Sequence, residues 1–418
     1  MPANSKLLIV TLYFPPCGAV AALRMTGFAR YLPRYGWNPI VVAPPNPPDE
    51  PSDPALKALL PEETTTVIPV PFAEGLWGRV NRRFFPNRLW QWQALRACRR
   101  AIREHRPDAI LTSHGPGFIH PIGLALKKEC GLPWVASFRD PWFALGPKNK
   151  GPRELWQDAR GERATLEAAD LVVGVSPRYS EGMRREYPAH ARKIVTITNG
   201  YDPDNFADSL TPPPRDRLSI LYTGELYYGR DPRALLDAIK ELNDSPVPGL
   251  QKVGFDFIGR FTADECDLPK EIAIRGLEGI STMSSVIPYK ECLRMTMQAD
   301  ILVLLHFPNF SHGLPAKVFE YVGARRPILA LTDDPGDIAW VLKESGVLHR
   351  VASQKDAAQI KHAIIGLLRD MERGTPAASP PREPTPFTRE NMARQLASQL
   401  AGLISSTESS RDRVNVVV

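Results

Sequence analysis

Short apolar runs alternate with amphipathic segments along most of the chain. The runs of the first half are "KLLIVTLYF", "NPIVVAP", "DAILTSH", "WVASFRD", "DLVVGVS" and "KIVTITNG". Those of the second half are "LSILYTG", "GFDFIGR", "ADILVLLH" and "PILALTD". Buried parallel strands read as continuous apolar runs, and strands that alternate with helical patterns are typical of βα units. The pattern therefore predicts an α/β protein built on parallel sheets.

The segments between these runs predict helices, and a polar stretch divides the chain in two. The expected helices cover residues 23–35, 123–130, 231–242, 289–298, 335–344 and 355–371. The dividing stretch, "YDPDNFADSLTPPPRDR", is rich in proline, which is typical of a linker. We therefore expect two doubly wound, Rossmann-like domains that face a cleft. Their expected ranges are residues 1–200 and 218–379, joined by a linker at 201–217.

The last part of the chain predicts a helix that returns to the first domain. Residues 380–404 begin with the proline-rich "PPREPTP" and continue as the amphipathic "TRENMARQLASQLAGLI". An amphipathic helix needs an apolar surface to cover its apolar stripe, so we expect this helix to pack on the N-terminal domain. Residues 405–418 read as a disordered tail.

Composition says more about the cellular compartment of the protein than about its function. The chain has 418 residues, a net charge of +6 and a pI near 9.0, which suits anionic ligands or an anionic membrane surface without selecting either. Its five cysteines are scattered and lack CxxC spacing, which favours a reducing compartment without a disulfide framework or a zinc site. The run "LLIVTLYF" stops at Pro15 and Pro16, so we interpret it as a first strand rather than a secretory signal.

Candidate binding residues of the first half follow its predicted strands, where ligands bind in open parallel sheets. Gly18 opens a helix whose N–H groups could face an anion, although a plain turn glycine fits equally well. The dinucleotide motif GxGxxG and the phosphate loop GxxxxGK[ST] are both missing from the sequence. His114 follows one strand, and Arg139 and Asp140 follow the next. His114 could instead be structural, and Arg139 and Asp140 could be a simple salt bridge.

In the second half, a glycine turn and a helix start both carry basic residues. Gly224 and Arg230 lie in "YTGELYYGRD", which suits a phosphate bound by a guanidinium near a helix N-terminus. Lys317 and Glu320 stand three residues apart in "LPAKVFEYVG". A lysine in the first turn could meet a phosphate, and a glutamate one turn later could accept hydrogen bonds from a ribose diol. The alternative is an ordinary surface pair between the two side chains.

These stretches together resemble the retaining glycosyltransferases of family 4. The likeness rests on "YFPP.G...R...FARYL..YGW", "SFRDPW", "AADLVVGVS", "ITNGYDPDNF", "YTGELYYGRDP" and "LPAKVFEYVGARRPILAL". The resemblance implies the GT-B fold and transfer of a sugar from a nucleotide-sugar donor with retention at the anomeric carbon. It implies that Gly18, Arg230 and Lys317 approach the donor diphosphate, and that Glu320 binds the ribose. It also implies that no cofactor or metal is needed.

Three positions depart from the family pattern. His312 stands where the first glutamate of a glutamate pair is usual, and Glu225 stands where an arginine is usual. Arg139 replaces a histidine that many members carry at the end of the "VASF" strand. On the acceptor side we expect Asp140 to orient or deprotonate the attacking hydroxyl, with His114 as the alternative. The donor sugar, the acceptor and the effect of these departures on activity stay open.

Three functions remain compatible with the sequence. The first is a glycosyltransferase that builds surface polysaccharide or glycolipid on a glycan or lipid-linked acceptor. The second is a non-catalytic relative that serves as an assembly partner, and the third is a nucleotide-sugar epimerase. We expect a cytoplasmic protein, with peripheral contact to the inner face of the cell membrane as an open alternative.

The segment from Trp77 to Trp92 is the candidate membrane contact. Its arginines and interleaved aromatic residues fit an interfacial helix on anionic lipid. From Leu89 onward, Leu89, Trp92, Leu95 and Ile102 also fit a helix that packs on the sheet with solvated arginines. Nucleic acid is not expected as a partner, since no nucleic-acid-binding fold accompanies the charge.

Overall fold

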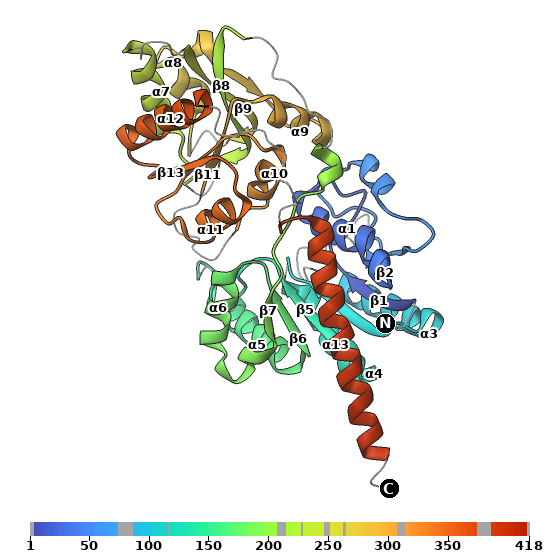
Figure 1. Ribbon diagram of the computed structural model, residues 1–418. Coiled ribbons are helices and arrows are strands. Elements are labelled where there is room, and N and C mark those ends of the chain that lie inside the picture. Colours follow the sequence, from blue (N-terminus) through green and yellow to red (C-terminus); the bar gives the residue numbers. More distant parts are fainter. Residues whose placement is uncertain are drawn as a thin grey trace. The chain divides into compact units, whose positions relative to one another are not determined.

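The protein is described here by a computed structural model, in which two compact units can be distinguished (Figure 1). The structure describes residues 4–73, 87–115, 117–146, 148–206, 215–226, 229–245, 251–261, 265–306, 314–373 and 386–415. Unit 1 consists of Met1–Asn199 and Arg389–Val418, and unit 2 consists of Gly200–Thr388. The final segment of the chain thus belongs to the N-terminal unit.

Unit 1 is built on a parallel sheet of seven strands. In spatial order these are β3 (Thr66–Pro69), β2 (Trp37–Ala43), β1 (Ser5–Val10), β4 (Ala109–Ser113), β5 (Trp134–Phe138), β6 (Leu171–Gly174) and β7 (Ile194–Thr196). The run that could be taken for a signal peptide is β1, an inner strand that is buried over most of its length. The strand order reverses between β1 and β4, so the carboxyl edge of these strands is where such sheets bind ligands.

Helices cover both faces of this sheet. One face carries α3 (Arg88–His105), α4 (His120–Cys130), α5 (Pro152–Ala168) and α6 (Pro177–Glu186), and the other carries α1 (Val20–Tyr31) and α13 (Arg389–Asn415). In Figure 1 the red helix α13 crosses unit 1, and it contacts α1. Its side chains Met392, Leu396 and Leu400 are buried there. The prediction of a C-terminal helix that packs on the N-terminal domain is confirmed.

Unit 2 repeats the plan with six parallel strands. In spatial order these are β10 (Thr282–Ser284), β9 (Lys252–Phe261), β8 (Arg217–Leu226), β11 (Ile301–Leu305), β12 (Ile328–Leu331) and β13 (His349–Ala352). Its helices are α7 (Arg233–Asp244), α8 (Leu268–Ala273), α9 (Tyr289–Gln298), α10 (Lys317–Ala324), α11 (Gly336–Ser345) and α12 (Ala357–Glu372). The order reverses between β8 and β11. The prediction of two Rossmann-like α/β domains is confirmed.

Several boundaries differ from the sequence prediction. The helix expected over residues 23–35 ends at Tyr31, and a short 3₁₀ helix (Leu32–Tyr35) follows because Pro33 cannot donate a backbone hydrogen bond. The tail expected from residue 405 is wrong up to Asn415, where α13 ends. Extending a helix that is already anchored adds one hydrogen bond per ordered residue, whereas a new helix must first nucleate.

Part of the predicted linker is built into unit 2. Tyr201 is 2% exposed, and its backbone bridges Thr388. Its ring lies 5.8 Å from that of Phe206, and both rings lie so close to Gly323 of α10 that a Cβ there would clash with them. Two aromatic side chains thus join residues 201–206 to the core of unit 2.

Candidate functional site

The carboxyl edge of the unit 2 sheet holds a buried lysine at its reversal point. Lys317 is the first residue of α10, the helix that follows β11, and its side chain reaches back to the end of β8. The ammonium donates to the carbonyl of Thr223 at 2.6 Å and lies 4.1 Å from the centroid of the Tyr222 ring. These contacts answer one open question, because Lys317 points into the sheet edge rather than forming a surface pair with Glu320.

Gly224 makes room for this lysine. Its φ of +121° is unfavourable for any residue with a side chain, and an added Cβ would lie 2.5 Å from the Lys317 nitrogen. The neighbouring Gly259 of β9 has φ +152°, and a Cβ there would lie 1.8 Å from the Gly224 carbonyl oxygen. Two adjacent strand ends therefore depend on glycine to bring a lysine against the backbone.

The electrostatics of this edge favour an anion. Burial lowers the pKa of Lys317 to about 7, and the nearby positive charge of Arg230 acts in the same direction. Arg230 donates to the Glu225 carbonyl at 3.2 Å, and the Tyr222 hydroxyl donates to the same oxygen at 2.9 Å. The Glu225 carboxylate lies 3.9 Å from Arg260. The structure thus brings Gly224, Arg230 and Lys317 together.

Glu320 and the following tyrosine have separate roles in this site. The hydroxyl of Tyr289, at the start of α9, donates to Glu320 at 2.7 Å. The buried hydroxyl of Tyr321 lies 3.1 Å from both the backbone nitrogen and the side-chain oxygen of Thr223. Tyr321 therefore ties α10 to the end of β8. Two residues of this site could not be found by sequence analysis, because they lie far along the chain from their partners. Tyr289 lies 31 residues from Glu320, and Thr223 lies 94 residues from Lys317.

In unit 1, two neighbouring strand ends form the corresponding edge. The backbone nitrogen of His114, just after β4, donates to the Ser137 carbonyl of β5 at 2.7 Å. Arg139 follows β5, and a Cβ on Gly115 would lie 2.6 Å from its Nη2 atom. The guanidinium lies 5.4 Å from the Tyr13 ring centroid, in the loop after β1. The loops after β1, β4 and β5 therefore meet at this edge.

His114 is buried among aromatic rings. It is 6% exposed, and its ring centroid lies 5.3 Å from that of Trp142 and 5.7 Å from that of Phe138. Burial lowers its pKa to about 3, and the positive charges of Arg139 and Lys150 act in the same direction. Such a ring is neutral at pH 7 and is a weak base in this state. His114 is thus less accessible to a ligand than Asp140, whose side chain is 49% exposed.

Several buried polar atoms around His114 lack a hydrogen-bond partner in the described part of the chain. They are both ring nitrogens of His114, Nε2 of His120 and the Ser137 hydroxyl. The other ring nitrogen of His120 lies 2.8 Å from the Thr112 hydroxyl, which also accepts from Trp134 at 2.9 Å. Since buried polar groups are usually hydrogen-bonded, these atoms represent unused hydrogen-bonding capacity next to Arg139.

Asp140 is the accessible carboxylate of this edge. Its side chain is 49% exposed, and its Oδ2 accepts from Nε of Arg139 at 3.1 Å. The salt bridge anticipated as the alternative therefore exists. An exposed carboxylate that is held by one arginine can still meet a second ligand, so the pair is compatible with both interpretations.

Two carboxylates that sequence analysis missed hold the loop after Asp140. Glu162 of α5 is fully buried and accepts from the backbone nitrogens of Phe143 and Ala144 at 2.7 and 3.0 Å. Asp158, one turn earlier, accepts from the indole nitrogen of Trp142 at 2.8 Å. The spacing of Asp158 and Glu162 was visible in the sequence, but it is common on exposed helices and carries no signal by itself.

The structure says less about the remaining predicted residues, which are Gly18, His312 and the segment from Trp77 to Trp92. The N–H of Gly18 donates to the Pro51 carbonyl at 2.8 Å, so it is already used within the protein, and α1 begins two residues later, at Val20. His312 lies outside the described residues, and so does most of the candidate membrane segment from Trp77 to Trp92. The interpretation that Trp92 packs on the sheet is wrong. Trp90 is buried instead and donates to the Val70 carbonyl at 2.8 Å, while Trp92 is 53% exposed.

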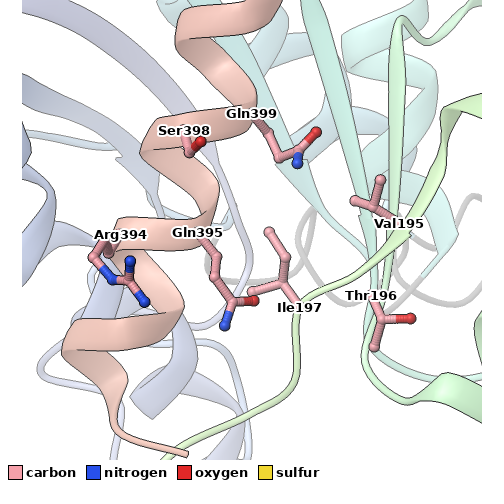
Figure 2. A pocket seen from close by; sticks show the side chains of 7 residues that line it. All are labelled: Val195, Thr196, Ile197, Arg394, Gln395, Ser398 and Gln399. Atoms are coloured by element: carbon pink, nitrogen blue, oxygen red, sulfur yellow. The ribbon is translucent and has the colours of Figure 1, made fainter. Parts of the chain in front are cut away.

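A pocket of about 210 Å³ lies between the end of β7 and α13 of unit 1 (Figure 2). It is lined by Val195, Thr196, Ile197, Arg394, Gln395, Ser398 and Gln399. It contains none of the predicted site residues.

Among the described residues, no three His, Cys, Asp or Glu side chains gather as a metal site would require. None of the helices in the described ranges is long and apolar enough to cross a membrane.

Comparisons with known proteins agree with this fold. Residues 21–205 match the model of Glycosyltransferase Family 4, a range that includes His114, Arg139 and Asp140 but neither the loop after β1 nor the unit 2 edge. A search of curated protein sequences finds no match.

Solved structures match over nearly the whole chain. Anabaena HepE in complex with UDP and glucose has a TM-score of 0.63 at 16% identity and covers 97% of this chain and 100% of its own. WaaG, a glycosyltransferase involved in lipopolysaccharide biosynthesis, has a TM-score of 0.56 at 14% identity, with coverage of 96% and 98%. A putative UDP-N-acetylglucosamine 2-epimerase from Listeria monocytogenes has a TM-score of 0.61 at 13% identity, with coverage of 97% and 98%. The chain therefore has the two-domain GT-B fold and is similar to family 4 glycosyltransferases over its N-terminal unit.

Proposed function

We propose that this protein is a glycosyltransferase that uses a nucleotide-sugar donor. The observation that carries the proposal is Lys317, a lysine buried at the reversal point of the unit 2 sheet. Its ammonium is held by a carbonyl and an aromatic ring rather than by a carboxylate, within the part of the chain that the structure describes. A buried cation without a direct counter-charge is suited to an anionic ligand, and a diphosphate supplies that charge.

The donor diphosphate would lie between Lys317, Arg230 and the first turn of α10. These groups could stabilise the charge of a departing diphosphate without a metal, since cationic side chains and a helix N-terminus act in the same direction. Gly224 lets the backbone approach the ligand. HepE and WaaG support this assignment, because the former is described with UDP and the latter as a glycosyltransferase.

On the acceptor side we assign Asp140 to orient or deprotonate the attacking hydroxyl. Arg139, which is paired with it, would set the position of the carboxylate. We further propose retention at the anomeric carbon and an acceptor that is a glycan or a lipid-linked glycan of a surface polysaccharide or glycolipid. These assignments rest on the resemblance to family 4 and on the exposure of Asp140.

Calorimetric titration with nucleoside diphosphates and the matching nucleosides tests the donor site. We expect UDP, ADP or GDP to bind more tightly than its nucleoside, because the diphosphate meets Lys317 and Arg230. The preferred base then selects a panel of nucleotide sugars for an assay of nucleotide release, and the anomeric configuration of the product is read by NMR. Equal affinity for diphosphate and nucleoside would contradict the donor site, and an inverted product would contradict retention.

The epimerase neighbour motivates one alternative function. Incubation of a nucleotide sugar without acceptor separates the two activities, because an epimerase converts or hydrolyses the sugar alone whereas a transferase needs a hydroxyl acceptor. A protein that binds the nucleotide but turns over no sugar in either assay would favour the non-catalytic assembly partner.

Glu320 would recognise the ribose in this proposal. Glu320→Gln keeps the shape of the side chain but removes its charge, so preference for the nucleotide over its 2′,3′-dideoxy analogue should fall severalfold. Glu344→Gln, at an exposed position of α11, is the matched control and should not alter this preference. An unchanged preference in Glu320→Gln would contradict ribose recognition and assign Glu320 a structural role that includes its contact with Tyr289.

A further inference from the structure

Two helices on one face of unit 1 each expose a tryptophan beneath an arginine. Trp92 of α3 is 53% exposed, and the guanidinium of Arg96 lies 4.6 Å from its ring centroid. Trp156 of α5 is 60% exposed, and the guanidinium of Arg160 lies 5.4 Å from its ring centroid. The same arrangement, with the arginine four residues after the tryptophan, thus occurs twice.

The two tryptophans lie at corresponding positions of two helices in one layer. α3 and α5 pack on the same face of the sheet, and each contacts α4 between them. Both helices run antiparallel to the strands, so their first turns lie at the carboxyl edge of the sheet. Trp92 and Trp156 are each the fifth residue of their helix, which places them in the second turn from that edge.

The surface around the tryptophans is basic. α3 also exposes Arg88 and Arg103, and α5 also exposes Arg153 and Arg163. Of the exposed carboxylates on these two helices, Glu104 and Glu154 are paired with basic side chains, whereas Glu167 lies near the far end of α5. Glu104 accepts from Arg100 at 2.8 Å, and Glu154 lies 3.4 Å from Lys150.

Neither tryptophan is needed for the packing of its helix. The buried residues of α3 are Trp90, Ala94, Cys98 and Ala101, and those of α5 are Glu162, Thr165 and Leu166. A large apolar ring left half exposed costs free energy that burial against a partner would recover. Tryptophan and arginine together are favoured at the interface between water and anionic lipid, where the ring sits at headgroup level and the cation meets phosphate.

We propose that this face, defined by Trp92, Arg96, Trp156 and Arg160, docks on an anionic membrane surface. The docking places the carboxyl edge with His114 and Asp140 next to the lipid headgroups, where a lipid-linked acceptor would be presented. The surface itself does not depend on the proposed transferase activity. It differs from the segment expected from the sequence, because its two halves lie 64 residues apart and only the structure brings them into one layer.

Sedimentation of the full chain with lipid vesicles tests this docking. The parent should bind vesicles rich in phosphatidylglycerol at low salt, bind them less at high salt, and bind pure phosphatidylcholine vesicles weakly. Reversing Arg96 and Arg160 to glutamate should weaken the binding by at least about tenfold, since each basic residue near an anionic surface contributes to it. Reversing Lys343 and Arg369, two exposed residues of unit 2, gives the same change in net charge and should leave most of the binding.

A second measurement locates the tryptophans. With brominated lipids, tryptophan fluorescence of the parent should be quenched on binding. The variant with Trp92→Phe and Trp156→Phe keeps most of the apolar area but should lose the quenching. Undiminished quenching in this variant, equal loss of binding in the unit 2 control, or failure of the parent to bind anionic vesicles at low salt would each overturn the proposal. Salt-sensitive binding to duplex DNA without binding to vesicles would also overturn it and assign the surface to nucleic acid.

Discussion

The carboxyl edges of the two sheets occupy the same topological position but differ in how their charged side chains are paired. In unit 2 a single lysine, Lys317, faces a backbone carbonyl and a ring. In unit 1 the cation Arg139 is neutralised by Asp140, and the buried ring beside it, His114, is uncharged. Among the described residues, Lys317 therefore lacks a direct counter-charge, whereas Arg139 at the unit 1 edge has one in Asp140.

This difference separates two kinds of chemistry on one fold. An uncompensated cation binds an anion, while a paired carboxylate in a rigid loop orients a neutral hydroxyl. If the assignment is right, variants of the unit 2 edge change ligand affinity, and variants of the unit 1 edge change turnover or the stability of the loop. The predictions below test that separation from the largest expected effect to the smallest.

Asp140→Asn should have the largest effect and should act on turnover alone. Loss of a positioned proton acceptor lowers rates by about 10²- to 10⁴-fold. Nucleotide affinity should stay within about twofold of the parent value, because unit 2 holds the diphosphate. Steady-state rates of nucleotide release and calorimetric titration measure the two quantities. A variant whose turnover matches the parent would move the role away from Asp140.

Lys317→Met should act on affinity and leave the fold intact. Losing one charge-assisted contact costs about 1.5–3 kcal/mol, so the affinity for the nucleoside diphosphate should fall by about 10- to 150-fold. The affinity for the nucleoside should barely change. Thermal stability should stay equal or rise, because a long apolar side chain replaces a buried amine.

The matched control for this variant is Lys343→Met, on the exposed surface of α11 in the same unit. It removes the same charge and should change neither affinity. Equal weakening of diphosphate and nucleoside binding by Lys317→Met would show a disturbed fold rather than a lost phosphate contact.

Glu162→Gln should act on the stability of unit 1. The buried carboxylate accepts two backbone N–H groups and the hydroxyl of Tyr187, and an amide can no longer accept all three with both of its ends. We expect a loss of about 1–3 kcal/mol in the free energy of unfolding, measured by urea denaturation. Glu167→Gln, at an exposed position of the same helix, is the matched control, with a change near zero. A loss of nucleotide affinity in Glu162→Gln would break the separation between the two edges.

The smallest expected effect is a pH dependence confined to the unit 2 edge. The free protein holds Lys317 with a pKa of about 7, lowered by burial and by Arg230, while the negative charges of Glu320 and Glu225 act in the opposite direction. A bound diphosphate favours the protonated lysine, so binding above pH 7 must take up a proton. Affinity should therefore fall as pH rises from about 7 to 8, by less than about tenfold.

Calorimetry in buffers of different ionisation enthalpy counts the protons taken up. The Cys292 thiol, whose pKa burial raises to about 11, stays neutral over this range and does not add to the count. In Lys317→Met the uptake should vanish. A parent protein that binds with the same affinity across this range would mean that Lys317 keeps its proton in the free state.

The sequence by itself determined the local part of this protein. The alternation of apolar runs and helical patterns predicted the central strands of both sheets, because the burial of parallel strands on both faces leaves continuous apolar runs. The rule that ligands bind at carboxyl strand ends then selected His114, Arg139, Asp140, Gly224 and Lys317 as candidates. Edge strands such as β3 and β10 were missed, since their residues are mostly exposed and carry no apolar run.

Only the tertiary structure decided what these candidates contact. That Lys317 turns inward depends on Thr223 and Gly224, more than 90 residues earlier, and on a positive φ that periodicity cannot show. That Trp90 is buried and Trp92 exposed depends on how α3 is rotated on the sheet, and two residues along a helix point in nearly opposite directions. Local patterns fix which elements form, whereas contacts between distant elements fix the direction, burial and protonation of each side chain.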